Sequence, residues 1–152
     1  MKHLLFHIGA DRYALPLRQV VRVLPLLELK RLPLAPAHVA GLLDFHGRPV
    51  PVIDLCLLSG LAATRAHVDS RIVLVDYVAP DGAVHLLGLL AERVLGVREL
   101  AAAELADSGV AAAPFLGQVA SEAGGMVQLV ELARLLPAAL RAILFAPAED
   151  AA

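Results

Sequence analysis

Two groups of residues in this sequence have side chains and a spacing that chemistry could use. His3 and His7 are four residues apart, which on a helix would place both imidazoles where one metal ion could bind them. Residues 44–48, Asp-Phe-His-Gly-Arg, gather an acid, an aromatic ring, an imidazole and a guanidinium around one glycine. A metal-binding or enzymatic regulator would be built on His3, His7, His46 and Asp44.

The residues around the first pair favour a strand over a helix. In His-Leu-Leu-Phe-His-Ile, residues 3–8, a strand would place His3, Leu5 and His7 on one face and the other three residues on the opposite face. A zinc site needs three or four ligands, and no third ligand suggests itself. Two exposed histidines on a strand face are the preferred interpretation, and the sequence predicts neither a metal nor a cofactor.

Nucleophilic catalysis has no supporting pattern. Cys56 is the only cysteine, which excludes an internal disulfide, and its leucine neighbours favour a buried thiol. Asp54 and Glu131 could be an acid and a base, but each lies near the end of a predicted strand, where a carboxylate commonly accepts hydrogen bonds from a turn or helix start. The serines lie in no nucleophile-elbow pattern; they are Ser59, Ser70, Ser108 and Ser121. We therefore expect no enzymatic activity.

Composition narrows the classes of partner. The chain has 152 residues, a net charge of -2 and a pI near 6.3, which gives no long-range attraction to phosphates, so no nucleic-acid partner is predicted. Although 59% of the residues are hydrophobic, no apolar run approaches the roughly 18 to 20 residues of a membrane-spanning helix. The N-terminus has too short an apolar stretch for a secretory signal. We expect a cytoplasmic protein with no direct membrane insertion.

Short apolar runs between turn signals predict a mainly all-β fold. Asp81-Gly82 separates two such runs, and Asp-Gly in that position is a strong hairpin signal. Gly47-Arg48 and Gly124-Gly125 lie between similar pairs of runs. Pro49 and Pro51 lack ladder donors and place their strand at an edge or bend. Many short strands joined by hairpins indicate barrels or a sandwich.

Two helices and a tail complete the expected elements. A short internal helix is expected around residues 36–40, leading into Gly41. The C-terminal residues 131–145 have helical spacing, which Pro137 would interrupt unless it begins a second helical segment. Residues 146–152 have the composition of a frayed acidic tail.

The sequence also repeats itself weakly. Residues 13–24 align with residues 87–98 at an offset of 74, and residues 47–55 align with residues 124–132 at an offset of 77. The second alignment pairs Asp54 with Glu131. Units of about 75 residues bury little apolar surface alone, so we expect two β units packed into one domain over residues 1–145.

The repeat singles out residues 44–48, because the equivalent turn is Ser-Glu-Ala-Gly-Gly. Side chains that a shared fold does not demand are candidates for recognition. Phe45 could supply contact area, and His46 and Arg48 donors, at a protein interface. The structural alternative has Phe45 folded into the core, Asp44 capping the turn, and His46 and Arg48 solvated.

The sequence resembles the CheW-like coupling proteins of bacterial chemosensory arrays. The resemblance rests on LLFHIG, DRYALPLRQVVRVL, LPLAPAHVAGLLDFHGRPVPVIDL, RIVLV, LLGLLAERVLGV and FLGQVASEAGGMVQLVELARLL, over roughly residues 3–137. It implies two packed SH3-like five-stranded β barrels and a non-catalytic adaptor at membrane-associated receptor arrays. The implied partners are a chemoreceptor cytoplasmic tip and the regulatory domain of a histidine autokinase.

The resemblance also implies a receptor-facing groove, and it departs from the family pattern there. Usual members have Asn-Leu-Arg-Gly where this chain has Asp44-Phe45-His46-Gly47, so imidazole replaces a permanently charged guanidinium. The aromatic-His-Gly pattern is more similar to adaptors of Wsp-type surface-sensing pathways, which implies output through a diguanylate cyclase, cyclic-di-GMP and biofilm behaviour. The groove residues carried across are Val20, Val23, Gly41, Leu42, Asp44, Phe45, His46, Gly47 and Arg48. For Val20 and Val23 the alternative is ordinary core.

Overall fold

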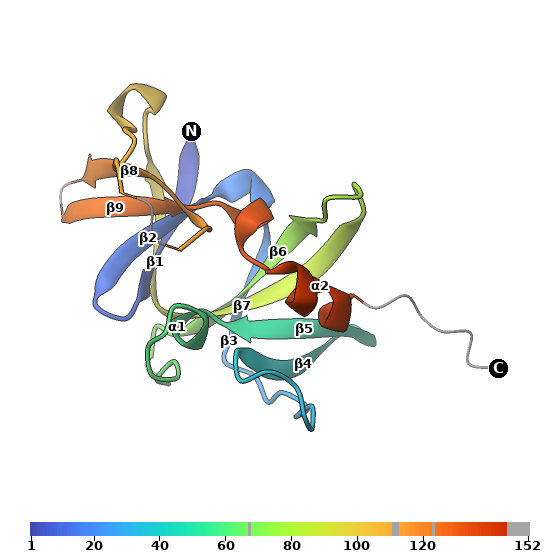
Figure 1. Ribbon diagram of the computed structural model, residues 1–152. Helices are drawn as coiled ribbons and strands as arrows, with labels where there is room; N and C mark the ends of the chain where they lie inside the picture. The colour runs from blue at the N-terminus through green and yellow to red at the C-terminus, as the bar shows by residue number, and fades with distance from the viewer. Residues whose placement is uncertain (67, 111–112, 123, 146–152) are drawn as a thin grey trace.

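A computed structural model describes residues 1–66, 68–110, 113–122 and 124–145, so the expected tail at 146–152 lies outside the described residues. Strands dominate it (Figure 1). They are β1 (Lys2–Ile8), β2 (Asp11–Pro16), β3 (Val20–Pro25), β4 (Val39–Phe45), β5 (Arg48–Asp54), β6 (Arg71–Val78), β7 (Val84–Glu99), β8 (Leu116–Glu122) and β9 (Gly125–Val130). The helical segments are η1 (Leu17–Gln19), α1 (Leu55–Leu58), η2 (Ala102–Glu104), η3 (Leu132–Arg134) and α2 (Ala138–Leu144).

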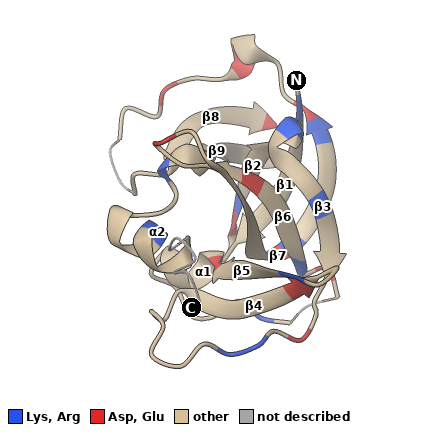
Figure 2. Cartoon of the chain, turned by 90° about the vertical axis from the view of Figure 1, so that its right-hand side faces the viewer, with Lys and Arg blue, Asp and Glu red and all other residues tan. Residues whose placement is uncertain are grey.

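The strands form two five-stranded units that share the long strand β7. In the A unit the order is β7-β1-β2-β9-β8, and in the B unit it is β3-β6-β7-β5-β4. The first half of β7 pairs with β6 and its second half pairs with β1. Figure 2 shows β3 on the outside of the molecule, where only β6 pairs with it. The expected mainly β fold with two β units is confirmed.

Strand pairing in one unit reproduces the pairing in the other. Leu43 pairs with Val50 in the B unit, and 77 residues further on Ala120 pairs with Val127 in the A unit. On the opposite side, Val23 pairs with Val73 in the B unit, whereas Val97, 74 residues after Val23, pairs with Leu4 in the A unit. The weak sequence repeat therefore corresponds to a repeat in strand pairing, at both predicted offsets.

The units are interleaved in sequence, not formed by the two halves of the chain. Strands β1 and β2 from the N-terminus belong to the same unit as β8 and β9 from the C-terminus. The chain passes from the A unit to the B unit between β2 and β3, and returns within β7. The large core cluster joins both units, because it contains Leu4 and Phe6 from β1 together with Val73 and Val75 from β6.

Strand β6 is covered on both faces, as its sequence predicts. Val73, Val75 and Tyr77 pack into the large core cluster, whereas Ile72 and Leu74 pack into a smaller cluster inside the B unit. A strand buried on both faces is an almost continuous apolar run, because neither side chain of an alternating pair meets water.

Two local expectations differ from the structure. Residues 36–40 do not form a helix: a turn, in which the Val39 amide donates to the Pro36 carbonyl at 3.0 Å, leads into β4, and the short internal helix is α1. Strand β5 is an edge strand only in its first half. Pro49 and Pro51 pair with β4 alone, and pairing with β7 begins at Val52, so the missing proline donors fall where no second strand is paired.

The C-terminal segment follows the interrupted pattern. Pro137 separates η3 from α2 and is the N-cap of α2. The helix is seated on the B unit by Phe145, whose ring centroid lies 5.6 Å from that of Tyr77 and 4.2 Å from that of His85. The helix therefore packs on the unit opposite the strand that precedes it.

Candidate functional site

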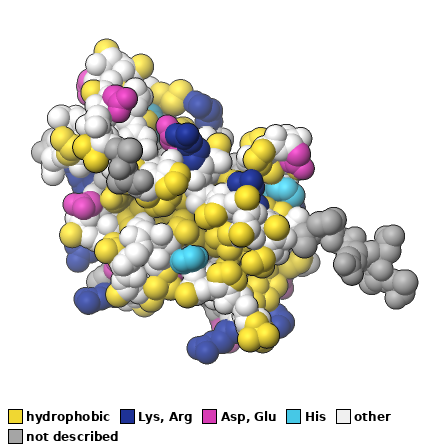
Figure 3. Space-filling model, viewed as in Figure 1, with side chains coloured by type: hydrophobic (Ala, Val, Ile, Leu, Met, Phe, Trp, Pro, Cys, Tyr) yellow, Lys and Arg dark blue, Asp and Glu magenta, His cyan; other side chains and the backbone are white. Residues whose placement is uncertain are grey.

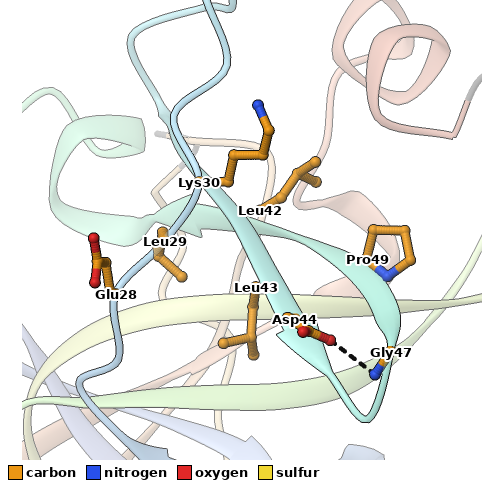
Figure 4. A pocket seen from close by; sticks show the side chains of 8 residues that line it. All are labelled: Glu28, Leu29, Lys30, Leu42, Leu43, Asp44, Gly47 and Pro49. Carbon is orange, nitrogen blue, oxygen red and sulfur yellow. Dashed lines mark hydrogen bonds between the residues drawn. The ribbon is translucent and has the colours of Figure 1, made fainter.

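The segment singled out by the repeat is the hairpin turn between β4 and β5. Phe45 pairs with Arg48, which leaves His46 and Gly47 as a two-residue turn with φ values of 52° and 82°. Positive φ at both positions is typical of a type I′ turn, which Gly47 adopts freely and His46 less readily. Asp44 Oδ1 accepts a hydrogen bond from the Gly47 amide at 2.8 Å (Figure 4). Asp44 and Gly47 therefore build the turn.

Phe45 lies between the core and the surface. It is half-buried and packs against the small cluster inside the B unit, while His46 and Arg48 are exposed. Its ring centroid is 4.5 Å from that of His46, and the Arg22 Cζ lies 5.9 Å from the Phe45 centroid. The structural alternative thus holds for Asp44 and in part for Phe45, whose half-buried ring lies near Arg22 and His46.

A cavity of about 570 Å³ adjoins this turn. Its lining combines apolar side chains with charged ones at the rim (Figure 4): Glu28, Leu29, Lys30, Leu42, Leu43, Asp44, Gly47 and Pro49. Leu42 and Lys30 exchange backbone hydrogen bonds of 2.8 and 2.9 Å, which hold the segment before β4 against that strand. A Cβ on Gly41 would lie 2.5 Å from the Lys30 carbonyl oxygen, so this approach requires glycine.

Val20 and Val23 lie on β3, the strand whose Arg22 reaches the same turn. Val20 is half-buried against the large core cluster, whereas Val23 is 38% exposed and its neighbour Val21 is 46% exposed. Arg22 links this strand to the turn through its contact with Phe45. Apolar side chains are also gathered over the centre of the face drawn in Figure 3. The structure thus brings β3 and the β4–β5 turn together, while Val20 serves partly as core.

The equivalent hairpin in the A unit has different chemistry. Glu122, equivalent to Phe45, accepts a hydrogen bond from Arg12, and its other carboxylate oxygen lies 3.8 Å from Arg98 Nε. The Arg12 guanidinium lowers the pKa of Glu122 from its ordinary value. The two hairpins share their strand pairing but not their surface, because one acid is paired within the chain where the other hairpin presents a ring and arginines.

The prediction of two exposed histidines on β1 is wrong. His3 is only 2% exposed, with Nδ1 3.0 Å from the Met1 carbonyl oxygen, and His7 is half-buried. Strand β1 lies between β2 and β7, and both of its faces are covered by core. His46 lies in the other unit, and within the described part of the chain no three His, Cys, Asp or Glu side chains are grouped to hold a metal.

The remaining candidates for catalysis, Cys56, Asp54 and Glu131, are engaged in contacts within the fold. Cys56 is buried, burial raises the pKa of its thiol, and Sγ donates to Glu92 Oε1 at 3.3 Å. Asp54 is the N-cap of α1 and also accepts hydrogen bonds from the Thr64 amide and hydroxyl. Glu131 is the N-cap residue of η3, but its side chain makes no capping hydrogen bond and instead accepts from Arg134 at 3.5 Å, so the predicted side-chain role holds for Asp54 alone.

Sequence reasoning missed Arg22 and Lys30. The alternation in Val-Val-Arg-Val-Leu, residues 20–24, indicates that Arg22 points to the same side as the half-buried Leu24. Nothing in the sequence indicates that β3 would bring it to a turn 23 residues away. Lys30 lies in an irregular segment, where no periodicity predicts its neighbours.

Within the described residues, no helix is long and apolar enough to cross a membrane.

Comparison with solved structures finds the crystal structure of the scaffolding protein TtCheW from Thermoanaerobacter tengcongensis. The TM-score is 0.80 at 21% identity, covering 91% of this chain and 89% of that one. This likeness shows the fold.

Sequence comparisons give a family. Protein FrzA of Myxococcus xanthus is 30% identical over 139 residues, 88% of this chain and 84% of that protein. Chemotaxis protein CheW of Helicobacter pylori (strain ATCC 700392 / 26695) is 31% identical over 72 residues; the match spans 47% of this chain and 44% of that protein, less than half its length. The model of the CheW-like domain matches residues 2–140. The chain therefore belongs to the CheW-like domain family.

Proposed function

We propose that this chain is a non-catalytic adaptor that couples the cytoplasmic tip of a chemoreceptor to the regulatory domain of a histidine autokinase. The observation that carries the proposal is the contrast between two equivalent hairpin tips. One neutralises its charge internally through Glu122 and Arg12, and the other exposes His46 and Arg48 beside a half-buried ring. Membership of the CheW-like family supplies the class of function.

The receptor face in this proposal is the B-unit surface formed by β3, the β4–β5 turn and the adjoining cavity. Phe45 offers apolar contact, and Arg22, His46 and Arg48 surround it with donors. Val23 adds exposed apolar surface on the opposite face of β3. An apolar centre with a polar rim is the usual anatomy of a protein interface. Gly41, Leu42, Asp44 and Gly47 act by shaping the surface, and Val20 by supporting β3.

The kinase face is proposed at the turns of the A unit, where Met126 is 66% exposed next to the β8–β9 hairpin. Separate faces on the two units would let one protein bind both partners at once. Contacts that are weak individually can give a stable assembly when several act together. Such an adaptor would work in the cytoplasm at membrane-associated receptor arrays.

The pathway proposed is a Wsp-type one, with output through cyclic-di-GMP and biofilm formation. Its support is the Phe45-His46-Gly47 pattern, which differs from the arginine-containing turn usual in the family. Transfer of the chain into a Wsp-type system lacking its own adaptor tests this: restored cyclic-di-GMP output supports the assignment, and restored swimming chemotaxis without that output contradicts it.

The test of the adaptor function is binding of the purified protein to two fragments: the cytoplasmic tip of a methyl-accepting receptor from the same genome, and the regulatory domain of the accompanying kinase. Phe45→Ala and His46→Ala should weaken receptor binding and leave kinase binding intact. Met126→Ala, the matched variant on the other hairpin, should do the opposite. Wild-type protein that binds neither fragment would refute the proposal.

A further inference from the structure

The guanidinium of Arg22 is exposed, oriented and without a carboxylate partner in the described part of the chain. Its Cζ lies over the Phe45 ring at 5.9 Å, within the range of a cation–π contact. Arg48 pairs with Phe45 across the β4–β5 ladder, and directly opposite residues project to the same face of a sheet. Neither arginine forms an ion pair with a described acid. Two permanent cations thus flank one ring.

The acids around Arg22 form no ion pair with it in the described part of the chain. Asp76, on β6 two residues beyond the Arg22 partner Leu74, is exposed. Asp44 is committed to the turn through its hydrogen bond from the Gly47 amide. Glu28 and Lys30, of opposite sign, both line the adjoining cavity. The carboxylate nearest in sequence is therefore part of the turn, and the guanidinium of Arg22 remains available to a group from another molecule.

The repeat shows that the scaffold does not need this arrangement. The residue equivalent to Arg22 is Gly96, because Arg22 pairs with Leu74 as Gly96 pairs with Leu5. The residue equivalent to Phe45 is Glu122, which is paired with Arg12 inside the A unit. The same fold thus forms with no cation and no ring at these positions, so Arg22 and Phe45 are additions to one unit only.

We propose that Arg22 recognises a carboxylate on the receptor tip, so that this chain selects a receptor segment with an Asp or Glu beside an apolar side chain. The inference rests on the proposed adaptor function. The apolar side chain of the receptor segment packs on Phe45, and the neighbouring carboxylate binds the guanidinium of Arg22. Arg22 thereby supplies, from β3, the permanent charge that His46 does not bring to the turn.

The physical basis is the chemistry of the guanidinium group. A guanidinium that lies over a ring is more weakly hydrated than an ammonium, and its planar donors match two carboxylate oxygens. Lysine at the same position would keep the charge but lose the paired donors. Arg22 is therefore a specificity-determining residue. Substitution by lysine, which keeps the charge, and by glutamine, which removes it, should separate the effect of its charge from that of its shape.

The experiment measures affinity for the same receptor tip and kinase regulatory domain by isothermal titration. Arg22→Gln should weaken receptor binding by about tenfold or more, as expected for loss of a charge-assisted hydrogen bond, with kinase binding unchanged. Arg22→Lys should lose part of that affinity. The matched control is Arg98→Gln, an arginine on the equivalent edge of the A unit that is 49% exposed, and it should change receptor binding by less than about twofold.

A charge swap identifies the partner group. Arg22→Glu should abolish receptor binding, and replacing one receptor Asp or Glu by Lys should restore it to that variant alone. If wild type binds the receptor and Arg22→Gln binds equally well, this inference is overturned while the adaptor function stands. If Arg22→Gln and Arg22→Lys lose both partners equally, Arg22 is structural and the inference is also overturned. If wild type binds no receptor, both proposals fall.

Discussion

Asp54 and Glu131 occupy equivalent positions in the two units, and the structure predicts very different consequences when each is replaced by alanine. Asp54 is 4% exposed and accepts hydrogen bonds from the Cys56 and Leu57 amides at 3.0 and 3.3 Å. It also accepts from the Thr64 amide and hydroxyl at 3.0 and 2.6 Å. Glu131 has a side chain that is 45% exposed and one long contact with Arg134.

The expected cost follows from these partners. Loss of a helix N-cap costs about 1 kcal/mol, and a hydrogen bond to a charged group contributes about 1.5–3 kcal/mol. Because these contributions are not additive and water can reach part of the site, we expect Asp54→Ala to lower the free energy of unfolding by about 3 kcal/mol. Glu131→Ala should change it by about 0.5 kcal/mol or less, as is usual for an exposed pair.

Urea unfolding followed by circular dichroism measures both values. With an m-value of about 2 kcal/mol/M, Asp54→Ala should move the midpoint by about 1.5 M at unchanged slope. Thr64→Val should lower the stability by about 1 kcal/mol in the wild type and by much less in Asp54→Ala, since its partner is then absent. Equal midpoint shifts for Asp54→Ala and Glu131→Ala would refute the assignment of Asp54 as the anchor of α1 and of residue 64.

Three further predictions concern other positions. The thiol of Cys56 should react with iodoacetamide at pH 8 at least tenfold more slowly in the folded than in the urea-unfolded protein, because burial raises its pKa and blocks access; equal rates would contradict this. The pKa of Glu122 is lowered by Arg12, so its stabilising effect is present above the ordinary carboxyl pKa and is lost as the pH falls through the lower folded value. The stability gap between wild type and Glu122→Gln should accordingly narrow from pH 6 to pH 3 in urea titrations, and a constant gap would argue against the ion pair. Gly41→Ala should lower the free energy of unfolding by about 2 kcal/mol or more, because its Cβ would meet the Lys30 carbonyl at a strained φ of 149°, and an unchanged midpoint would count against that contact.

Much of the fold could be predicted from the turn residues and from the repeat. Turn signals depend on residues that are close in sequence, and the repeat depends on a regular offset. The Asp81-Gly82 hairpin, the covered strand β6 and the break at Pro137 are all local features. The burial of His3 was missed because it depends on β7 pairing with the other edge of β1, about 95 residues away along the chain. The capping prediction failed for Glu131, whose side chain makes no capping hydrogen bond to η3, because glutamate is not among the residues that cap well, whereas aspartate is.

The same limit applies to the candidate site, and the repeat explains why. Comparison of the two turns in the sequence identified residues 44–48 as different. The structure adds Arg22, which lies over Phe45. The alternation along β3 indicates only which of its side chains face the core. A charge neutralised within the chain, like that of Glu122, contributes to folding, whereas an exposed cation without an acid contributes little to it. Between the two equivalent hairpins the difference is therefore one of charge: Glu122 is paired within the chain, whereas the Arg22 guanidinium beside Phe45 forms no ion pair with a described acid.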